Sequence, residues 1–520
     1  MKTISPPSRL ALALTAALAF GTTSSVFAGT IWDGGGTSNT NINLNTNWDG
    51  LSGGVVNALD GTTGATFGTG GSTATINVDA SFTGITINRN GNFAIADGAG
   101  SLTVGTDGIT VTLPTVNARI HTISESSLIL GGNQTWSVTN NGTRVAELIV
   151  SSIISDGGNA YGITKTGSGV LSLSTAANTF SGGIAVEAGT LNIRSGGSAN
   201  NSTVFLGAAA NSGSTVKVGV INGATNPSSP LEVVAQTSGA ATTRILGTNS
   251  STSGQWSGPI TMNGDLTVDT ASAGSFTLQT GATVNLGANT LTLRSTSSGS
   301  VIAKSVISGT GGIVVNNTST GNATLEGIST YTGATTVEAG KLLIASGGSL
   351  ANTASITVFG SATLENANGG VINRNLTLHE GAALTTSSAG SSFTPASSIT
   401  VVGDLSDGFS GIALTADAGS GLVKNNATLF LNLSNVMVGS YGLSAGAGFS
   451  GSFGASFYNG MQMSSTGTGY TLTSGGFNIE FENATNLLNI SAIPEPSSFA
   501  LLTSGLTAAI VSLRRRRRAV

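Results

Sequence analysis

The sequence lacks cysteine and is poor in charge and in aromatic residues. Its 520 residues include no Cys, 8% charged residues, 5% aromatic residues and 2 histidines. The absence of Cys excludes a disulfide scaffold and any Cys-ligated metal site. A formal net charge of −4, with no basic stretch of domain size, argues against a nucleic-acid-binding protein. Ordinary disorder is also disfavoured, because 39% of the residues are hydrophobic.

Glycine is abundant instead, with 76 residues, and Ser, Thr, Asn and Val are common. This composition is typical of many short strands joined by tight turns. Seven of the 19 basic residues lie at the two ends, in Lys2, Arg9 and the run 514–518. Without these seven, 12 basic residues face 23 acidic ones, so the central body carries a net charge near −11.

Residues 1–28 have the pattern of a secretory signal peptide. Lys2 and Arg9 form a positive region, and residues 10–20 (LALALTAALAF) are uncharged and apolar. Residues 26–28 (Val-Phe-Ala) provide a small-x-small cleavage site, so we expect cleavage between Ala28 and Gly29 by signal peptidase. The alternative is a buried N-terminal helix.

The C-terminal residues 493–520 contain three elements in order. A Pro-Glu-Pro motif precedes an uncharged stretch at 499–513 and a cluster of five arginines. The stretch is short for a membrane span, which needs about 20 residues, but flanking arginines can snorkel and would hold the tail on the cytoplasmic side. The residues of this motif and cluster are Pro494, Glu495, Pro496, Arg514, Arg515, Arg516, Arg517 and Arg518.

This tail resembles the PEP-CTERM sorting signal. The resemblance implies that a membrane transpeptidase, exosortase, recognises the signal and processes the chain near the motif. The helix at 499–513 would then be a transient transmembrane anchor in a bacterium, and the body would reach the cell envelope, the cell surface or the extracellular matrix. An ordinary tail anchor that is never cleaved is the alternative.

The body predicts an all-β solenoid. Apolar-polar-apolar triplets such as 76–78, 85–87 and 93–95 recur every eight or nine residues, with Gly, Asn, Asp or Ser between them. Three such steps make about 25 residues, which is one coil of a three-sided right-handed parallel β-helix. About 18 coils would form a rod of about 90 Å between residues 29 and 490. A hairpin sandwich would give the same local pattern.

A longer internal repeat supports the solenoid. Residues 178–193 (NTFSGGIAVEAGTLNI) align without gaps to residues 329–344 (STYTGATTVEAGKLLI). With the lead-in at 162–169 (GITKTGSG), the first copy resembles the autotransporter-associated β-strand repeat, also called the passenger-associated transport repeat. We place the copies near 162–193 and 313–344 in a β-helical body at 29–429. The second lacks the Lys-Thr-Gly-x-Gly lead-in, and the resemblance implies a surface-exposed β-helix.

Two regions at the ends of the body differ from the rest. Trp32 and Trp48 occur in two related Trp-Asp-Gly segments, which we interpret as a capping coil or, as the sharper hypothesis, a pair that stacks on sugars. Residues 430–492 are richer in Phe and Tyr, and 469–490 alternate like two or three strands. We interpret 430–492 as a C-terminal β cap, with a separate β domain as the alternative.

The sequence offers little that predicts chemistry. His121 and His379 are far apart in the chain, and a lone His on such a face is usually exposed or hydrogen-bonded. A polysaccharide lyase or hydrolase would need clustered carboxylates, often with Ca²⁺. The candidate pairs, which are more typical of a solvated surface, are Asp404 with Asp407 and Glu480 with Glu482.

The sequence therefore predicts a non-enzymatic structural or adhesive protein with no cofactor and no metal. Extracellular polysaccharide is the expected partner, and nucleic acid is not. The alternatives are a polysaccharide-active β-helix enzyme and a glycan-binding module that uses Trp32, Trp48, Trp136 or Trp256.

Overall fold

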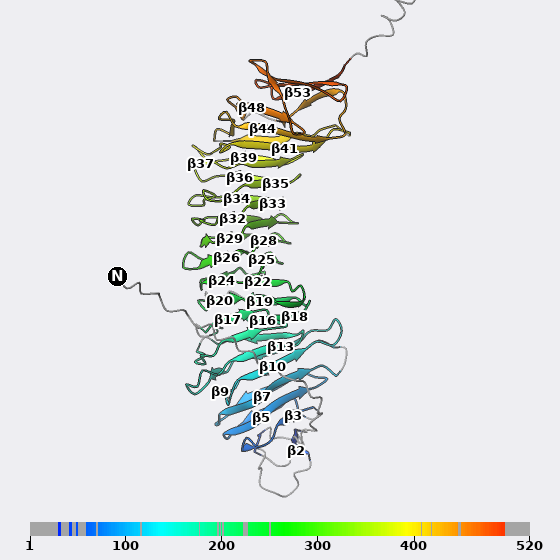
Figure 1. Ribbon diagram of the computed structural model, residues 1–520. Helices are drawn as coiled ribbons and strands as arrows, with labels where there is room; N and C mark the ends of the chain where they lie inside the picture. Colours follow the sequence, from blue (N-terminus) through cyan, green and yellow to red (C-terminus); the bar gives the residue numbers. More distant parts are fainter. Residues whose placement is uncertain are drawn as a thin grey trace, which may run out of the picture.

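The computed structural model describes most of the chain between residues 30 and 493. The described residues are 30–32, 41–43, 48–49, 59–68, 71–114, 117–175, 177–194, 197, 199, 202–221, 227–248, 251–406, 408–417, 419–445 and 449–493. They form an all-β parallel solenoid of about 15 turns, stacked into an elongated body (Figure 1). The predicted all-β parallel solenoid is confirmed, with about 15 turns in place of the roughly 18 predicted, and the hairpin sandwich is not.

Each coil visits three sides, and each side is a ladder of mostly parallel strands. Ladder 1 occupies the first side in the N-terminal two thirds of the rod. Its strands are β1 (Thr30–Trp32), β2 (Trp48–Asp49), β3 (Ala65–Phe67), β5 (Ala80–Asn88), β7 (Leu102–Thr112), β10 (Gln134–Thr139), β13 (Ile163–Thr166), β15 (Ile184–Val186), β17 (Val204–Leu206), β20 (Leu231–Val233), β24 (Ile260–Met262), β27 (Thr283–Asn285) and β30 (Val306–Ser308). Within it, β2 pairs antiparallel to β1. Further along, the same place in the coil is taken by β37 (Val371–Ile372), β40 (Ser392–Phe393), β43 (Leu422–Val423) and β47 (Phe449–Ser450).

Ladder 2 runs through nearly the whole rod and is its most continuous side. Its strands are β4 (Thr73–Ile76), β6 (Phe93–Asp97), β8 (Arg119–Ile123), β11 (Ala146–Val150), β14 (Val170–Leu173), β16 (Gly189–Ile193), β19 (Val216–Val220), β22 (Arg244–Thr248), β25 (Leu266–Thr270), β28 (Leu291–Ser295), β31 (Ile313–Asn316), β33 (Thr335–Ala339), β35 (Ile356–Val358), β38 (Leu376–His379), β41 (Ser398–Asp404), β44 (Thr428–Ser434) and β48 (Ala455–Tyr458), which pairs with the short antiparallel β49 (Met461–Gln462).

Ladder 3 lies between ladder 2 and the next strand of ladder 1. It begins with β9 (Ser127–Leu130) and β12 (Ile153–Ser155), which continue from the first residues of β7. Its later strands are β23 (Gly254–Trp256), β26 (Phe276–Leu278), β29 (Val301–Ala303), β32 (Asn322–Leu325), β34 (Lys341–Ile344), β36 (Thr363–Asn366), β39 (Ala383–Thr386), β42 (Ile412–Ala416) and β46 (Ser444–Ala445). A separate pair, β18 (Ala210–Ser212) and β21 (Ser238–Ala240), protrudes between ladders 1 and 2.

Coil length varies along the rod, whereas the sequence predicts coils of uniform length. In ladder 2, Leu291 is the register partner of Ile313, whereas Ile399 is the partner of Leu429, so the coil that begins at Ile399 is the longer one. The strand β41 of the longer coil has seven residues, and β28 of the shorter coil has five. Most of the extra residues lie in the connections between sides.

Columns of apolar side chains fill the interior. Val268, Leu293 and Val315 are register partners on consecutive strands of ladder 2, and all three are fully buried. Each such side chain contributes roughly 1.5–3 kcal/mol by leaving water. The alternation of apolar and polar residues in the sequence is therefore the alternation between inside and outside of the coil.

Small polar side chains occupy the corners. Thr270 and Ser295 are buried register partners, and the single O–H of each lies within hydrogen-bonding distance of two carbonyls of its own turn. On the next corner strand, the hydroxyl of Ser275 accepts the backbone N–H of Ser300 from the following coil at 3.1 Å. These contacts satisfy turn groups that the ladders leave without partners, which explains the abundance of Ser, Thr and Asn.

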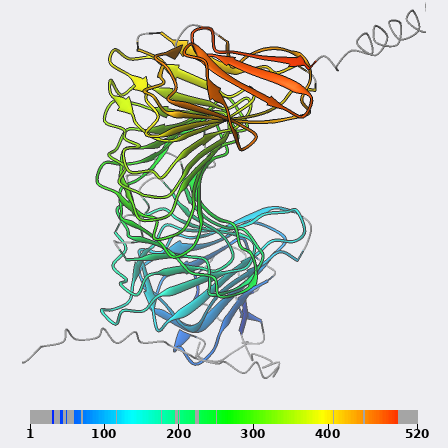
Figure 2. The ribbon, with the colours of Figure 1, turned by 45° about the horizontal axis from the view of Figure 1, so that its top comes forward.

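An antiparallel sheet closes the C-terminal end. Its order is β45 (Gly439–Gly442), β53 (Leu487–Ala492), β52 (Phe477–Glu482), β51 (Gly469–Ser474) and β50 (Ser464–Ser465), and Figure 2 shows it over the last coils. Phe481, at its centre, is fully buried against Phe453 of the last coil. The predicted boundary at residue 430 falls within β44, and the solenoid continues to Tyr458.

Candidate functional site

The predicted sorting and cleavage residues lie outside the described part of the chain. These are Ala28, Gly29, Pro494, Glu495, Pro496, Arg514, Arg515, Arg516, Arg517 and Arg518, together with the apolar stretch 499–513. Among the described residues, no helix has the length and apolar character needed to cross a membrane.

The tryptophans of the described chain point inward. Trp32, Trp136 and Trp256 are fully buried, so their rings present no open face on which a sugar could stack. Trp136 donates its indole N–H to Gln134 at 2.8 Å inside the coil. Only the backbone of Trp48 is described, as the register partner of Trp32. Trp32 therefore fits the capping interpretation better than the sugar-stacking hypothesis.

The two histidines occupy different environments. His121 points into the core between Phe93 and Leu148 and is fully buried, and neither ring nitrogen has a hydrogen-bond partner among the described residues. The expectation that it would be exposed or hydrogen-bonded is wrong. Burial, with smaller effects from the nearby arginines, lowers the pKa of His121 to about 4, so the ring is neutral at pH 7. His379 stacks on Phe359 with ring centroids 4.2 Å apart.

The two predicted carboxylate pairs are described only in part, because Asp407 of the first pair lies outside the described residues. Asp404 accepts hydrogen bonds from Ser406, Ser434 and Asn435, which hold its pKa down to about 2. Glu480 and Glu482 share one face of β52, as predicted. In the described chain, no group of three or more His, Asp or Glu side chains is arranged to hold a metal ion.

One carboxyl pair was not expected from the sequence. Glu125 is 1% exposed and contacts Asp97 of the preceding coil. Burial, together with this contact, raises the pKa of Glu125 to about 7, whereas hydrogen bonds lower that of Asp97. A proton on Glu125 supplies the hydrogen that two carboxylates would lack. Asp97 ends β6 and Glu125 follows β8, the next strand of ladder 2, so the pair is a contact between adjacent coils.

The corner of the first repeat copy holds a buried cation. Lys165 lies on β13 with its side chain directed inward, and it is fully buried. Its ammonium group donates to the carbonyls of Thr166 at 2.7 Å, Gly167 at 2.8 Å and Ala188 at 3.0 Å. The first two belong to its own turn and the third to the next coil, so Lys165 ties the two coils together. Burial lowers the pKa of Lys165 to about 7.

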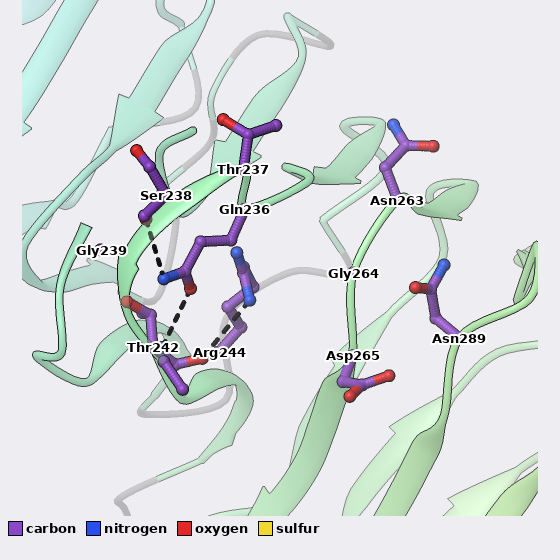
Figure 3. Close-up of a pocket in the computed structure, with 11 residues that line it drawn as sticks. Gln236, Thr237, Ser238, Gly239, Thr242, Arg244, Asn263, Gly264, Asp265 and Asn289 are labelled. Atoms are coloured by element: carbon purple, nitrogen blue, oxygen red, sulfur yellow. Dashed lines mark hydrogen bonds between the residues drawn. The ribbon is translucent and has the colours of Figure 1, made fainter. Parts of the chain in front are cut away.

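A pocket of about 480 Å³ lies at the corner between ladders 1 and 2 (Figure 3). It exists because the connection at this corner changes length. The segments 207–215 and 234–243 are long and carry β18 and β21, whereas 263–265 in the next coil is a short turn. β21 is therefore the last strand that protrudes at this corner. The pocket lies between β21 and the short turn 263–265 of the following coil.

Polar groups line the pocket on the side of β21 and on the side of the following coils. On the side of β21, Gln236 braces the loop by donating to Ser238 and Ala240 and accepting from Thr242. On the opposite side, Asp265 accepts the backbone N–H of Thr290 at 2.7 Å. The complete lining is Gln236, Thr237, Ser238, Gly239, Ala241, Thr242, Arg244, Asn263, Gly264, Asp265 and Asn289.

Arg244 is the charged centre of the pocket and is only 6% exposed. Its Nη1 donates to the Thr242 carbonyl at 3.4 Å, and its Nε and Nη2 have no hydrogen-bond partner among the described residues. Two glycines make room for it: a Cβ on Gly207 would lie 2.7 Å from Nε, and a Cβ on Gly264 would lie 3.4 Å from Cζ. Burial lowers the pKa of Arg244, and the charge of Asp265 opposes this effect.

Sequence reasoning missed this site. Arg244 belongs to no motif of the sequence, and the sequence does not show that its side chain turns inward. The lengths of the connections would have indicated the pocket, because they follow from the strand positions alone. The connections at 207–215 and 234–243 are long, and the one at 263–265 is short.

The described residues form an all-β parallel solenoid whose corners are held by polar contacts between coils. The model of the family described as Passenger-associated-transport-repeat matches residues 163–193 and 318–344. The chain thus carries two copies of this repeat, close to the predicted 162–193 and 313–344. No curated protein matches the chain, and no solved structure does. The repeats and the solenoid fit a secreted, passenger-like β-helix protein.

Proposed function

We propose that this chain is an exported structural or adhesive rod of a bacterial cell surface or extracellular matrix, which exosortase sorts through residues 493–520. The observation that carries the proposal is the continuous solenoid with two passenger-associated transport repeats. A rod of this kind offers long faces of Ser, Thr and Asn that suit weak, repeated contacts with polysaccharide. Signal peptidase and exosortase are its expected processing partners.

The way in which charge is used supports a structural role. Several charged residues of the described chain pair across neighbouring coils, such as Arg294 with Asp269 at 3.2 Å and Lys341 with Glu365 at 2.9 Å. Lys165 and the Asp97–Glu125 pair also connect adjacent coils. Charged groups placed in this way hold adjacent coils together, as a structural role requires.

The test of sorting compares three versions of the chain by cell fractionation. Deletion of residues 494–520 should release the body from the envelope, because both the motif and the anchor are lost. Replacement of Pro494 and Pro496 by Ala keeps the apolar stretch and the arginines. This variant should accumulate uncut in the membrane if exosortase reads the motif. Unchanged localisation of both variants contradicts the sorting proposal.

The non-enzymatic role has a separate test. The purified body is incubated with matrix polysaccharides, and new reducing ends are measured. We expect no increase above a heat-denatured control. Sustained release of reducing ends, abolished by substitution of Glu125 or Asp97, would replace the structural role with an enzymatic one.

A further inference from the structure

The pocket next to β21 contains a buried arginine whose hydrogen-bond donors are only partly paired within the described chain. Arg244 is buried to more than nine-tenths, and two of its guanidinium nitrogens have no partner in the described chain. Hydrogen-bonding nitrogens of a buried guanidinium that lack partners are costly, and the charge of Asp265 offsets this cost only in part. A carboxylate is the anion that best matches a guanidinium group.

The surroundings of Arg244 restrict the kind of anion. The volume of about 480 Å³ lies within the range of small-molecule sites and exceeds what a simple inorganic anion needs. The remaining polar lining includes Asn263, Asn289 and Thr237. Their side-chain donors already bind within the chain, to Glu232, to Met262 and Leu286, and to Ala209 respectively. Their side-chain oxygens can therefore accept from ligand hydroxyls, and Asp265 adds a further acceptor near the cation.

The local backbone also points to a ligand. Gly207 adopts a φ of +97°, and a Cβ there would collide with the Arg244 side chain. The outer edge of β21 has no neighbouring strand among the described residues, because the next coil turns at 263–265. Its backbone groups therefore border the pocket, where a polyhydroxylated ligand can pair with them.

We propose that this pocket binds an acidic sugar unit, with the sugar carboxylate on Arg244 and the sugar hydroxyls on the Asn263, Asn289 and Thr237 side of the cavity. The inference rests on the proposed adhesive function and deepens it, because it names uronic-acid polysaccharide as the partner class. The binding site itself does not depend on export or sorting.

The test measures binding of trigalacturonate to the purified full chain by isothermal titration calorimetry, with neutral galactotriose as the comparison. Trigalacturonate should bind, with an affinity that falls as salt is raised, and galactotriose should bind at least about tenfold more weakly, since a charged hydrogen-bonded contact is lost. Acetate at the same concentration should not displace the sugar. Equal binding of both sugars, displacement by acetate or no binding of trigalacturonate overturns the proposal.

Two variants and one control assign the binding to the pocket. Arg244→Gln removes the cation and should weaken trigalacturonate binding by at least about tenfold. Ser238→Trp fills the pocket from an exposed position of β21 and should have the same effect even if the Arg244 variant does not fold. Lys304→Gln removes an exposed cation elsewhere on the rod and should change nothing.

The outcomes separate this inference from the proposed function. Wild-type affinity in a folded Ser238→Trp variant places the sugar elsewhere and contradicts the pocket. Loss of binding in Arg244→Gln with normal fractionation supports the site and leaves sorting to its own test. A correctly sorted wild-type chain that does not bind trigalacturonate refutes the inference while the structural role stands.

Discussion

The two repeat copies share a sequence but occupy different sides of the solenoid. In the first copy, residues before and after the Val-Glu-Ala-Gly corner lie on ladders 1 and 2, in β15 and β16. In the second copy, the equivalent residues lie on ladders 2 and 3, in β33 and β34. The repeat therefore specifies a strand, a corner and a strand, and not a particular face of the rod.

The inner support of this corner differs between the copies. In the first, Lys165 donates to the carbonyl of Ala188. In the second, the equivalent carbonyl of Ala339 accepts the backbone N–H of Asn317 at 3.0 Å, and the Asn317 side chain donates to Lys341. The register position of Lys165 is taken by the buried Val315. A neutral amide thus replaces the buried ammonium where the Lys-Thr-Gly lead-in is missing.

A second difference is that two buried apolar side chains of the first copy are replaced by two side chains with hydroxyl groups in the second. Phe180 and Ile184 of the first copy correspond to Tyr331 and Thr335 of the second, and all four are buried. The hydroxyls of Tyr331 and Thr335 lie 2.5 Å apart. Thr353 of the next coil extends this contact, since it lies 3.0 Å from Thr335 and donates to Gly333. The extra oxygens are acceptable because they satisfy one another.

The largest expected effect concerns the glycine that both corners share. Gly189 and Gly340 have φ values of +68° and +69°. An added Cβ would lie 2.4 Å from the Gly169 oxygen in one copy and 2.5 Å from the Asn317 Cβ in the other. Alanine at either position should destabilise its coil by about 3 kcal/mol or more, from the left-handed conformation and the steric collision.

Amide hydrogen exchange, which resolves individual coils, measures this loss. Gly91→Ala is the control, because a Cβ there meets nothing within 4 Å. If only one copy loses protection, the shared-corner account fails.

The next effect distinguishes the copies. Lys165→Met removes three hydrogen bonds to turn carbonyls in the first copy and should lower local stability by about 2–3 kcal/mol. The reciprocal Val315→Lys places an ammonium in an apolar position of the second copy and should also destabilise. Exchange protection of the two corners measures both effects, and Lys304→Met at an exposed site is the control. If Val315→Lys stabilises the second copy, both corners accept a buried lysine, and the proposed difference between the copies is wrong.

The same lysine should produce a pH dependence that the second copy lacks. The pKa of Lys165 falls from 10.5 to about 7 on folding, so between these values the unfolded chain binds more protons. The free energy of unfolding of the wild type should therefore rise with pH from about 7 to 10.5, relative to Lys165→Met. The slope is at most about 1.4 kcal/mol per pH unit for a single titrating group. Parallel denaturation profiles of the two proteins over this range would contradict a buried, titrating lysine.

The smallest effect tests the replacement of two apolar side chains by two side chains with hydroxyl groups. Tyr331→Phe and Thr335→Ile should each cost about 1 kcal/mol, because each leaves a buried hydroxyl with fewer partners. The double variant, which recreates the pair of the first copy, should cost less than the sum of the two. A double-mutant cycle by denaturant unfolding gives the coupling. Simple additivity would mean that the two hydroxyls do not depend on each other.

The sequence predicts strands and repeats well because the same side chains create pattern and packing. Triplets such as Ile85 to Ile87 become buried-exposed-buried strands, and the residues that match between 178–193 and 329–344 form equivalent corners. The side on which a repeat lies is not predictable, because it depends on the summed lengths of all preceding connections. For that reason, the rotation of the second copy could not be foreseen.

The candidate site was predictable only in part. His121 and Lys165 are polar residues at inward positions, and their neighbours on adjacent coils, which are distant in sequence, decide whether they are satisfied. The Arg244 pocket exists because a long connection is followed by a short one in the next coil. Its lining comes from three coils, so no local motif records it.

The central claim has two parts. Ladder 2 is one continuous parallel ladder to which both copies contribute a strand, and the second copy is shifted by one side of the coil relative to the first. Thr190 and Thr336 occupy the same outward column of ladder 2, through Lys217, Ile245, Thr267, Thr292 and Val314. The chain has no cysteine, so cysteines introduced for spin labels are the only ones present.

Pulsed electron paramagnetic resonance on labels at Thr190 and Thr336 measures this arrangement most directly. Six strand spacings predict a backbone separation of about 29 Å. The label pair Ala185 and Thr336, which is equivalent in sequence, should be farther apart because these residues lie on different sides. A shorter distance for Ala185 and Thr336 than for Thr190 and Thr336 would contradict the account.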